Sequence, residues 1–109
     1  MKRIIYAPAA LDSLEDLLTW TIEQYGDDQA ERYTGQLVAR LEALASDRLP
    51  RAKSCSQLVQ GRRDVPDLSY YREGHHYLIL RETDDSLELV EVFHSRMNIE
   101  ARLSDLERD

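Results

Sequence analysis

The chain has 109 residues, one cysteine and a formal net charge of −7, with 21 acidic against 14 basic residues. This length fits one domain, and a single cysteine excludes a disulfide framework or a cysteine-rich zinc site. The acidic balance argues against a general nucleic-acid binder, because phosphate contact requires a dominant positive surface. No apolar run approaches the roughly 20 residues that span a membrane, and no signal peptide is visible. We therefore expect one cytoplasmic domain over residues 1–109, without membrane association.

The first half of the chain predicts a short strand followed by two helices. The apolar run within residues 2–7 suits an edge or near-edge strand, and Pro8 suits the first turn of a helix, where no N–H is needed. Apolar residues then recur at steps of three and four up to Tyr25, and again over residues 30–44, which is the period of one helix face. Gly26 is expected to end the first helix. Because the link is so short, the helices must form an antiparallel hairpin.

The second half of the chain predicts a sheet. Residues 48–67 show no regular period and read as a long connection. The apolar pattern then changes, and turn signals divide it into three antiparallel strands at about 68–72, 75–82 and 87–94. Helical spacing returns after Asn98 and predicts a short C-terminal helix. The expected fold is α+β: an N-terminal strand and a helical hairpin packed on a small antiparallel sheet, in the order βααβββ, followed by the short helix.

The stretch "EVFHSRMN", residues 91–98, ends the last predicted strand and places a histidine, a serine, an arginine and a methionine there, where catalytic side chains are often found. Strict alternation along a strand puts Val90, Val92 and His94 on one face. A half-buried histidine that closes a corner of the core is the plainer interpretation. The functional interpretation is metal-independent RNA cleavage, in which basic side chains clamp a phosphodiester and the histidine acts as an acid. That chemistry would require four side chains to converge: Arg72, Arg81, His94 and Arg96.

Other catalytic arrangements find little support in the sequence. His75 and His76 are adjacent, so on a strand they point to opposite faces and do not chelate one metal together. Cys55 lies in the irregular connection, and nothing places a base or an orienting group beside it. We expect no metal, no cofactor and no catalytic residue.

Four segments in a fixed order resemble the RelE/ParE toxin superfamily, and its ParE branch in particular. They are "YAPAALDSLEDL", "YGDDQAERYTGQLVARLEALA", "YREGHHYLILRE" and "LELVEVFHSRMNIEARL", which together cover nearly the whole chain. The resemblance implies the toxin of a type II toxin–antitoxin system, which arrests growth and serves plasmid maintenance. It further implies direct inhibition of DNA gyrase and neutralisation by a ParD-like ribbon–helix–helix antitoxin. Nucleic acid would be reached only indirectly, through the antitoxin.

Two alternatives stay open within this resemblance. RelE-like relatives cut mRNA on the ribosome, using a basic cluster and usually a tyrosine near the C-terminus. Here the last tyrosine is Tyr77, and the chain from Glu73 onward is net acidic, so both features favour the gyrase inhibitor. Docking on a protein needs shape and a few anchors rather than a basic groove. The other alternative is a non-toxic member that only forms a complex, which the acidic balance favours.

The sequence yields two sets of candidate contact residues. Those expected to face the target are Arg72, Arg81, His94, Arg96 and Met97. Those on the helical hairpin that either meet the antitoxin or pack the core are Leu14, Leu18, Tyr33 and Leu37. Because the chain is acidic, we expect antitoxin affinity to come mainly from apolar burial against the hairpin and the sheet edge.

Overall fold

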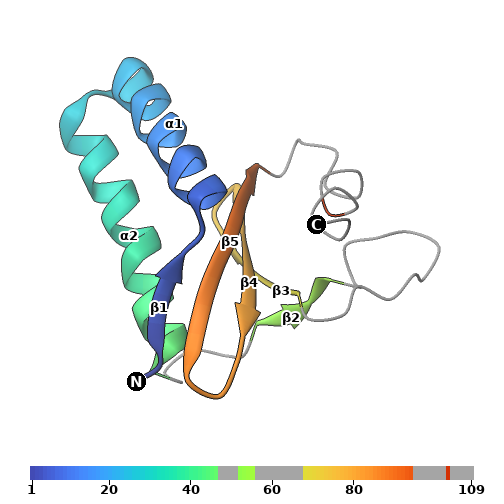
Figure 1. The fold of residues 1–109 in the computed structure, drawn as a ribbon. Coiled ribbons are helices and arrows are strands. Elements are labelled where there is room, and N and C mark those ends of the chain that lie inside the picture. Colours follow the sequence, from blue (N-terminus) through green and yellow to red (C-terminus); the bar gives the residue numbers. More distant parts are fainter. Residues whose placement is uncertain (47–51, 56–67, 95–102, 104–109) are drawn as a thin grey trace.

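The computed structural model describes residues 1–46, 52–55, 68–94 and 103 (Figure 1). A strand and a helical hairpin come first, and a run of antiparallel strands follows. The α+β fold predicted from the sequence is confirmed. The elements in chain order are β1 (Arg3–Tyr6), α1 (Pro8–Tyr25), α2 (Asp27–Ala45), β2 (Lys53–Ser54), β3 (Ser69–Glu73), β4 (His76–Glu82) and β5 (Ser86–His94).

The five strands form one sheet in the order β1-β5-β4-β3-β2. The pairs β2–β3, β3–β4 and β4–β5 are antiparallel, as predicted for the last three strands. The sheet is nevertheless mixed, because β1 runs parallel to β5 at one edge. A parallel pair needs a long crossover, and the helical hairpin supplies it. The sequence placed β1 at or near an edge but did not show its direction.

The helices form because an apolar stripe coincides with suitable end residues. Pro8 occupies the first turn of α1, and Gly26 separates the helices with a φ of 90°, which a residue with a side chain rarely adopts. The hairpin covers one face of the sheet, as Figure 1 shows. Its buried stripe meets the facing strand residues in the first core cluster. This cluster contains Ala10, Leu37, Leu41, Leu44, Ala45, Leu78, Leu80, Leu87, Leu89 and Val92.

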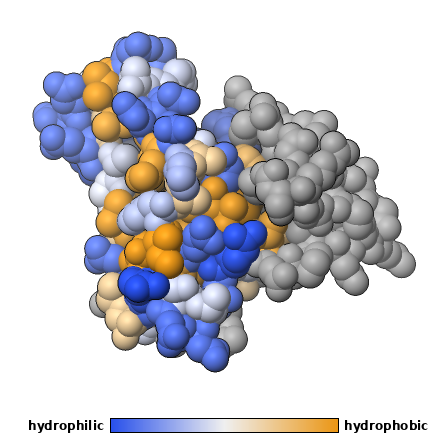
Figure 2. Space-filling view, viewed as in Figure 1, coloured by the Kyte–Doolittle hydropathy of each residue, from blue (hydrophilic) through white to orange (hydrophobic). Residues whose placement is uncertain are grey.

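A second core cluster lies on the opposite face of the sheet. It contains Cys55, Leu68, Ile79, Val90, Phe93 and Leu103, with Tyr70 and Tyr77 packed against it. Both faces of the central strands are therefore buried. The exposed surface over the hairpin is mostly hydrophilic, and hydrophobic residues gather over β1 and β5 (Figure 2).

The pairing of β4 with β5 contains an irregularity that changes which side chains share a face. Ile79 pairs with Glu91 and Leu80 with Leu89, so Val90 is an extra residue in β5. Such a β-bulge shifts the alternation by one position. Val92 therefore lies in the first cluster and Val90 in the second. The prediction that Val90, Val92 and His94 share one face was wrong for Val90.

Several predicted features lie outside the described residues. They include most of the 48–67 connection, the candidate residues Arg96 and Met97 and, apart from Leu103, the short C-terminal helix that was predicted after Asn98. Leu103 itself is fully buried in the second cluster. Across the part of the chain that the structure describes, no helix is long and apolar enough to cross a membrane.

Candidate functional site

Three histidines gather where β4 begins and β5 ends. His76 and His94 face each other across the two strands, with ring centroids 5.1 Å apart and the rings perpendicular. His75 lies in the turn before β4, and its ring stacks on that of His94 at 6.2 Å. His94 thus lies beside both of the adjacent histidines.

Two side chains of helix α2 bind the β3–β4 turn beside this cluster. The Tyr33 hydroxyl lies 2.6 Å from Nδ1 of His76 and donates a longer bond, of 3.4 Å, to the carbonyl oxygen of Glu73. Arg40, two turns further along α2, forms an ion pair with the Glu73 carboxylate at 2.8 Å. The turn itself needs Gly74, whose φ of 60° disfavours any side chain. The hairpin and the sheet thus hold the histidines in place.

The half-buried position of His76 has an electrostatic consequence. Burial of the ring lowers its pKa from the usual 6.5 to about 4, and the neighbouring His94 and His75 act in the same direction. The imidazole is therefore neutral at neutral pH. Burial also raises the pKa of the Tyr33 phenol, and the Glu73 carboxylate raises it further. Neither group is tuned toward pH 7, where an acid or base catalyst works best.

A groove opens between α1 and the histidine cluster, with a volume of about 370 Å³. Ser13, Asp16, Leu17 and Trp20 follow the helical period, so they form a single stripe along α1. The sheet contributes the opposite wall. The hydroxyl of Ser13 donates to Oε1 of Glu91, which also accepts from the backbone N–H of Val92 at 2.9 Å and joins α1 to β5. The lining residues are Ser13, Asp16, Leu17, Trp20, His76, Val92 and His94.

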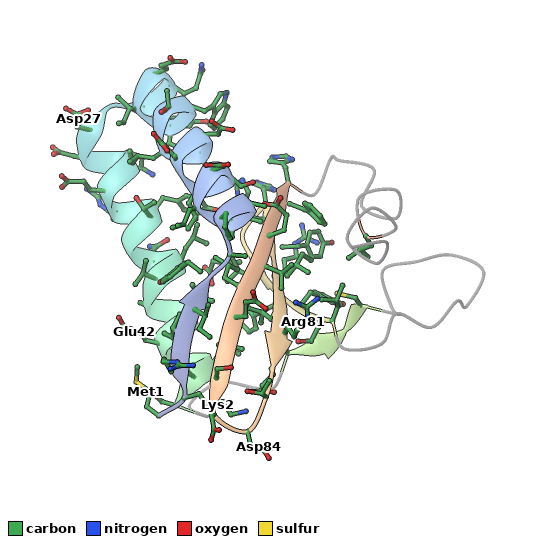
Figure 3. The ribbon with its side chains drawn as sticks, viewed as in Figure 1. Met1, Lys2, Asp27, Glu42, Arg81 and Asp84 are labelled. Carbon is green, nitrogen blue, oxygen red and sulfur yellow. The ribbon has the colours of Figure 1, made fainter. Side chains whose placement is uncertain are left out.

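The structure does not bring the predicted basic side chains together. Arg72 donates to the carbonyl oxygen of Gly74 at 3.0 Å, and its guanidinium lies 5.5 Å from the ring centroid of Tyr77, on the sheet face away from the helices. Arg81 pairs with Glu88 at 3.1 Å. It projects from the same far side of the sheet, well below the C-terminal end of β5 (Figure 3).

His94 stands apart from both arginines. It lines the groove on the helix side of the sheet. Arg81 is five residues along β4 from His76, the partner of His94, which corresponds to roughly 16 Å. The convergence that metal-independent RNA cleavage would require is therefore not found for Arg72, Arg81 and His94, and Arg96 and Met97 lie outside the described residues. Among the described residues, no three His, Cys, Asp or Glu side chains are arranged so that they could hold a metal ion, and this includes the three clustered histidines.

Comparison with known proteins identifies the family. The model of the ParE toxin of the type II toxin–antitoxin system parDE matches residues 4–99. The chain is a member of the ParE toxin family. Toxin ParE1 of Mycobacterium tuberculosis, in strain CDC 1551 / Oshkosh and in strain H37Rv, is 32% identical over 104 residues, which cover 94% of this chain and 98% of the relative.

A solved structure shares the fold of this ParE-family chain. It is the "Chromosomal ParDE TA system from P. aeruginosa", and it superimposes with a TM-score of 0.64 over 86% of this chain and 96% of the other. The sequences are only 11% identical, so this similarity concerns the fold.

The four hairpin residues predicted to meet an antitoxin or pack the core of this ParE-family toxin differ in burial. Leu37 is 1% exposed and belongs to the core. Leu14 and Tyr33 are half-buried against the first cluster, and Leu18 is half-buried as well. Leu37 is thus a packing residue, whereas the other three retain accessible surface.

The sequence reading missed the most accessible apolar residue beside the groove. Trp20 is 52% exposed, and its ring meets that of Tyr25 edge-on at 6.0 Å between centroids. Trp20 falls outside the apolar stripe read from α1, which runs through Leu14, Leu17 and Leu18. A tryptophan outside the core-facing stripe of a surface helix is itself a signal, because exposed tryptophans are enriched at binding surfaces.

Proposed function

We propose that this ParE-family toxin inhibits DNA gyrase by direct binding in the cytoplasm and is neutralised by a ParD-like ribbon–helix–helix antitoxin. Its membership of the ParE family supports a toxin–antitoxin role, and the similarity of its fold to a chain of a ParDE system fits an antitoxin partner. The choice of gyrase over the ribosome rests on the arrangement of the basic side chains.

The separation of Arg72 and Arg81 from His94 is the observation that carries this choice. Cleavage of RNA without a metal requires cations and an acid or base within reach of one phosphate. Here the two arginines lie on one face of the sheet, and His94 lies on the other, beside a His76 that stays neutral at neutral pH. Such an arrangement favours docking on a protein over chemistry on RNA.

The proposed target contacts are the exposed side chains of Arg72 and Arg81, together with His94, Arg96 and Met97. Loss of the Arg72 or Arg81 side chain is expected to reduce toxicity more than stability, because exposed side chains of this kind contribute little to folding. The proposed antitoxin contacts are the half-buried Leu14, Leu18 and Tyr33.

Inducible expression, with and without the neighbouring antitoxin gene, tests the function. Filamentation and a DNA-damage response that the antitoxin suppresses are expected, together with loss of supercoiling by purified gyrase. Rapid translation arrest with cut mRNA would instead indicate a RelE-like nuclease, and normal growth at good expression would indicate a non-toxic member.

Substitutions then test the contacts. Arg72→Ala, Arg81→Ala and Arg96→Ala should each weaken toxicity. Arg32→Ala is a matched control, because Arg32 is exposed on α2 rather than on these strands and forms no ion pair with the described residues. Full toxicity of all three variants, with folding intact, would contradict the proposed contacts.

A further inference from the structure

The groove beside α1 combines apolar walls with an accessible aromatic ring. Leu17, Val92 and Trp20 supply apolar surface, and the 52% exposure of Trp20 leaves much of its ring open to solvent. The ring of Tyr25 meets that of Trp20 edge-on, with 6.0 Å between the centroids. An apolar groove that includes a partly exposed tryptophan is the kind of place where a single side chain of a partner can anchor.

The same groove carries a carboxylate that has no cation beside it among the described residues. Asp16 lines the groove and forms no ion pair with any of them. Its helix has four acidic residues and no basic one: Asp12, Glu15, Asp16 and Glu23. On the opposite wall His76 is neutral at neutral pH, so it does not offset this charge.

Asp16 and Trp20 are well placed to act together. They are four residues apart on α1, so they lie on one side of the helix about one turn apart. A carboxylate binds a guanidinium through strong charge-assisted hydrogen bonds, and the face of a tryptophan attracts a cation that lies over it. An arginine or lysine could satisfy both groups while a neighbouring apolar side chain enters the groove.

We propose that this groove binds a segment of the antitoxin that carries an arginine or lysine next to an apolar anchor residue. The proposal rests on the proposed pairing with an antitoxin and specifies its chemistry. Charge complementarity selects this occupant: the groove presents a negative charge and an aromatic ring, and an acidic segment would be repelled. The groove would therefore act as a specificity element that rejects antitoxins lacking the cation.

The binding constant of the purified toxin for its cognate antitoxin tests this proposal. Asp16→Asn should weaken binding about tenfold or more and flatten its dependence on salt, since one charge-assisted contact is lost. Asp12→Asn is the matched control, because it removes the same charge from the same helix outside the groove, and it should change binding less than about twofold. Asp16→Lys should bind an antitoxin whose cation is replaced by glutamate better than the wild-type antitoxin.

A second measurement needs no antitoxin. N-acetyl-arginyl-leucinamide, titrated into the toxin and followed by amide NMR, should perturb Asp16, Trp20 and His94, whereas N-acetyl-glutamyl-leucinamide should not. Equal responses to the two peptides, or none at the groove, would overturn the proposal. The proposed function is tested by other results: it is contradicted if the antitoxin forms no complex or if the chain is not toxic. In either case the peptide titration still shows whether the groove prefers a cationic to an anionic side chain.

The variants also identify other occupants. If Asp16→Asn leaves antitoxin binding unchanged and abolishes toxicity, the target occupies the groove and the proposal is overturned. If it instead dissolves a dimer seen by sedimentation, the occupant is a second copy of the chain, which likewise overturns the proposal.

Discussion

The hydroxyl of Tyr33, in the N-terminal half of α2, lies 2.6 Å from Nδ1 of His76, the first residue of β4. This contact joins the helical hairpin to the β3–β4 turn, beside which the histidine cluster lies. Arg40 reinforces it by pairing with Glu73 at the end of β3. The position of the histidines therefore depends on α2 as well as on the sheet.

Removing the hydroxyl should weaken this connection. Tyr33→Phe leaves a half-buried imidazole nitrogen without its partner, and we expect the free energy of unfolding to fall by about 1 kcal/mol. Urea denaturation measures the change. Tyr25→Phe is the control, because Tyr25 is 66% exposed, and it should be nearly neutral. An equal effect of the two variants would show that the Tyr33–His76 bond contributes nothing.

Acid should destabilise the protein through His76. Its folded pKa of about 4 lies below the unfolded value of 6.5, so between these values the unfolded chain binds the proton more readily. Stability is therefore fully present above about pH 6.5 and falls until about pH 4, below which this group has no further effect. Because the ring is only half-buried, solvent screening reduces the effect, and we expect a loss of about 1 kcal/mol.

A comparison of variants separates this contribution from the carboxylates that titrate nearby. His76→Asn keeps a polar group close to the position of Nδ1 but does not titrate. Urea midpoints measured from pH 7 to pH 4 should decline less steeply for the variant than for the wild type. Parallel curves would mean that His76 does not carry the acid sensitivity.

The fold was largely predictable because its elements depend on local pattern. The helical period, Gly26 between the helices and Gly74 in the strand turn are visible in the sequence, and each acts where expected. The direction of β1 was not predictable, because parallel and antiparallel pairing of a short apolar edge strand bury similar side chains. The parallel pairing of β1 with β5 depends on tertiary structure, because the helical hairpin provides the crossover that a parallel pair needs.

The candidate site was less predictable, because one extra residue in β5 determines which side chains at the end of the strand share a face. Val90 bulges out of the pairing with β4, and from Val92 onward each side chain lies on the opposite face from the one that strict alternation predicts. His94 consequently lies beside α1 and His76, while Arg72 packs over Tyr77 on the other side. Nothing in the alternation of apolar residues marks a bulge when both faces of the sheet are buried.

The burial difference between two hairpin leucines predicts different phenotypes. Leu37 is 1% exposed in the first core cluster, so Leu37→Ala should cost about 2–4 kcal/mol of stability and reduce antitoxin binding only through unfolding. Leu18 is half-buried, so Leu18→Ala should cost less than about 1 kcal/mol and weaken antitoxin binding directly. Denaturation and binding measured on the same samples separate the two effects. Normal binding by a folded Leu18→Ala would remove Leu18 from the proposed antitoxin surface.

The two glycines at positions 74 and 35 should respond in opposite directions to the same substitution. A β-carbon at Gly74 would meet only the Tyr33 side chain, with the hydroxyl at an ordinary contact distance of 3.4 Å. The cost of Gly74→Ala therefore comes from the backbone, whose φ of 60° strains a residue with a side chain, and we expect a loss of stability of about 1 kcal/mol. Gly35 lies on the exposed side of α2, where a β-carbon would meet nothing within 4 Å, so Gly35→Ala should stabilise by about 0.5–1 kcal/mol. Thermal or urea unfolding of both variants measures the pair. Stabilisation by Gly74→Ala would mean that the β3–β4 turn does not require the left-handed conformation at this position.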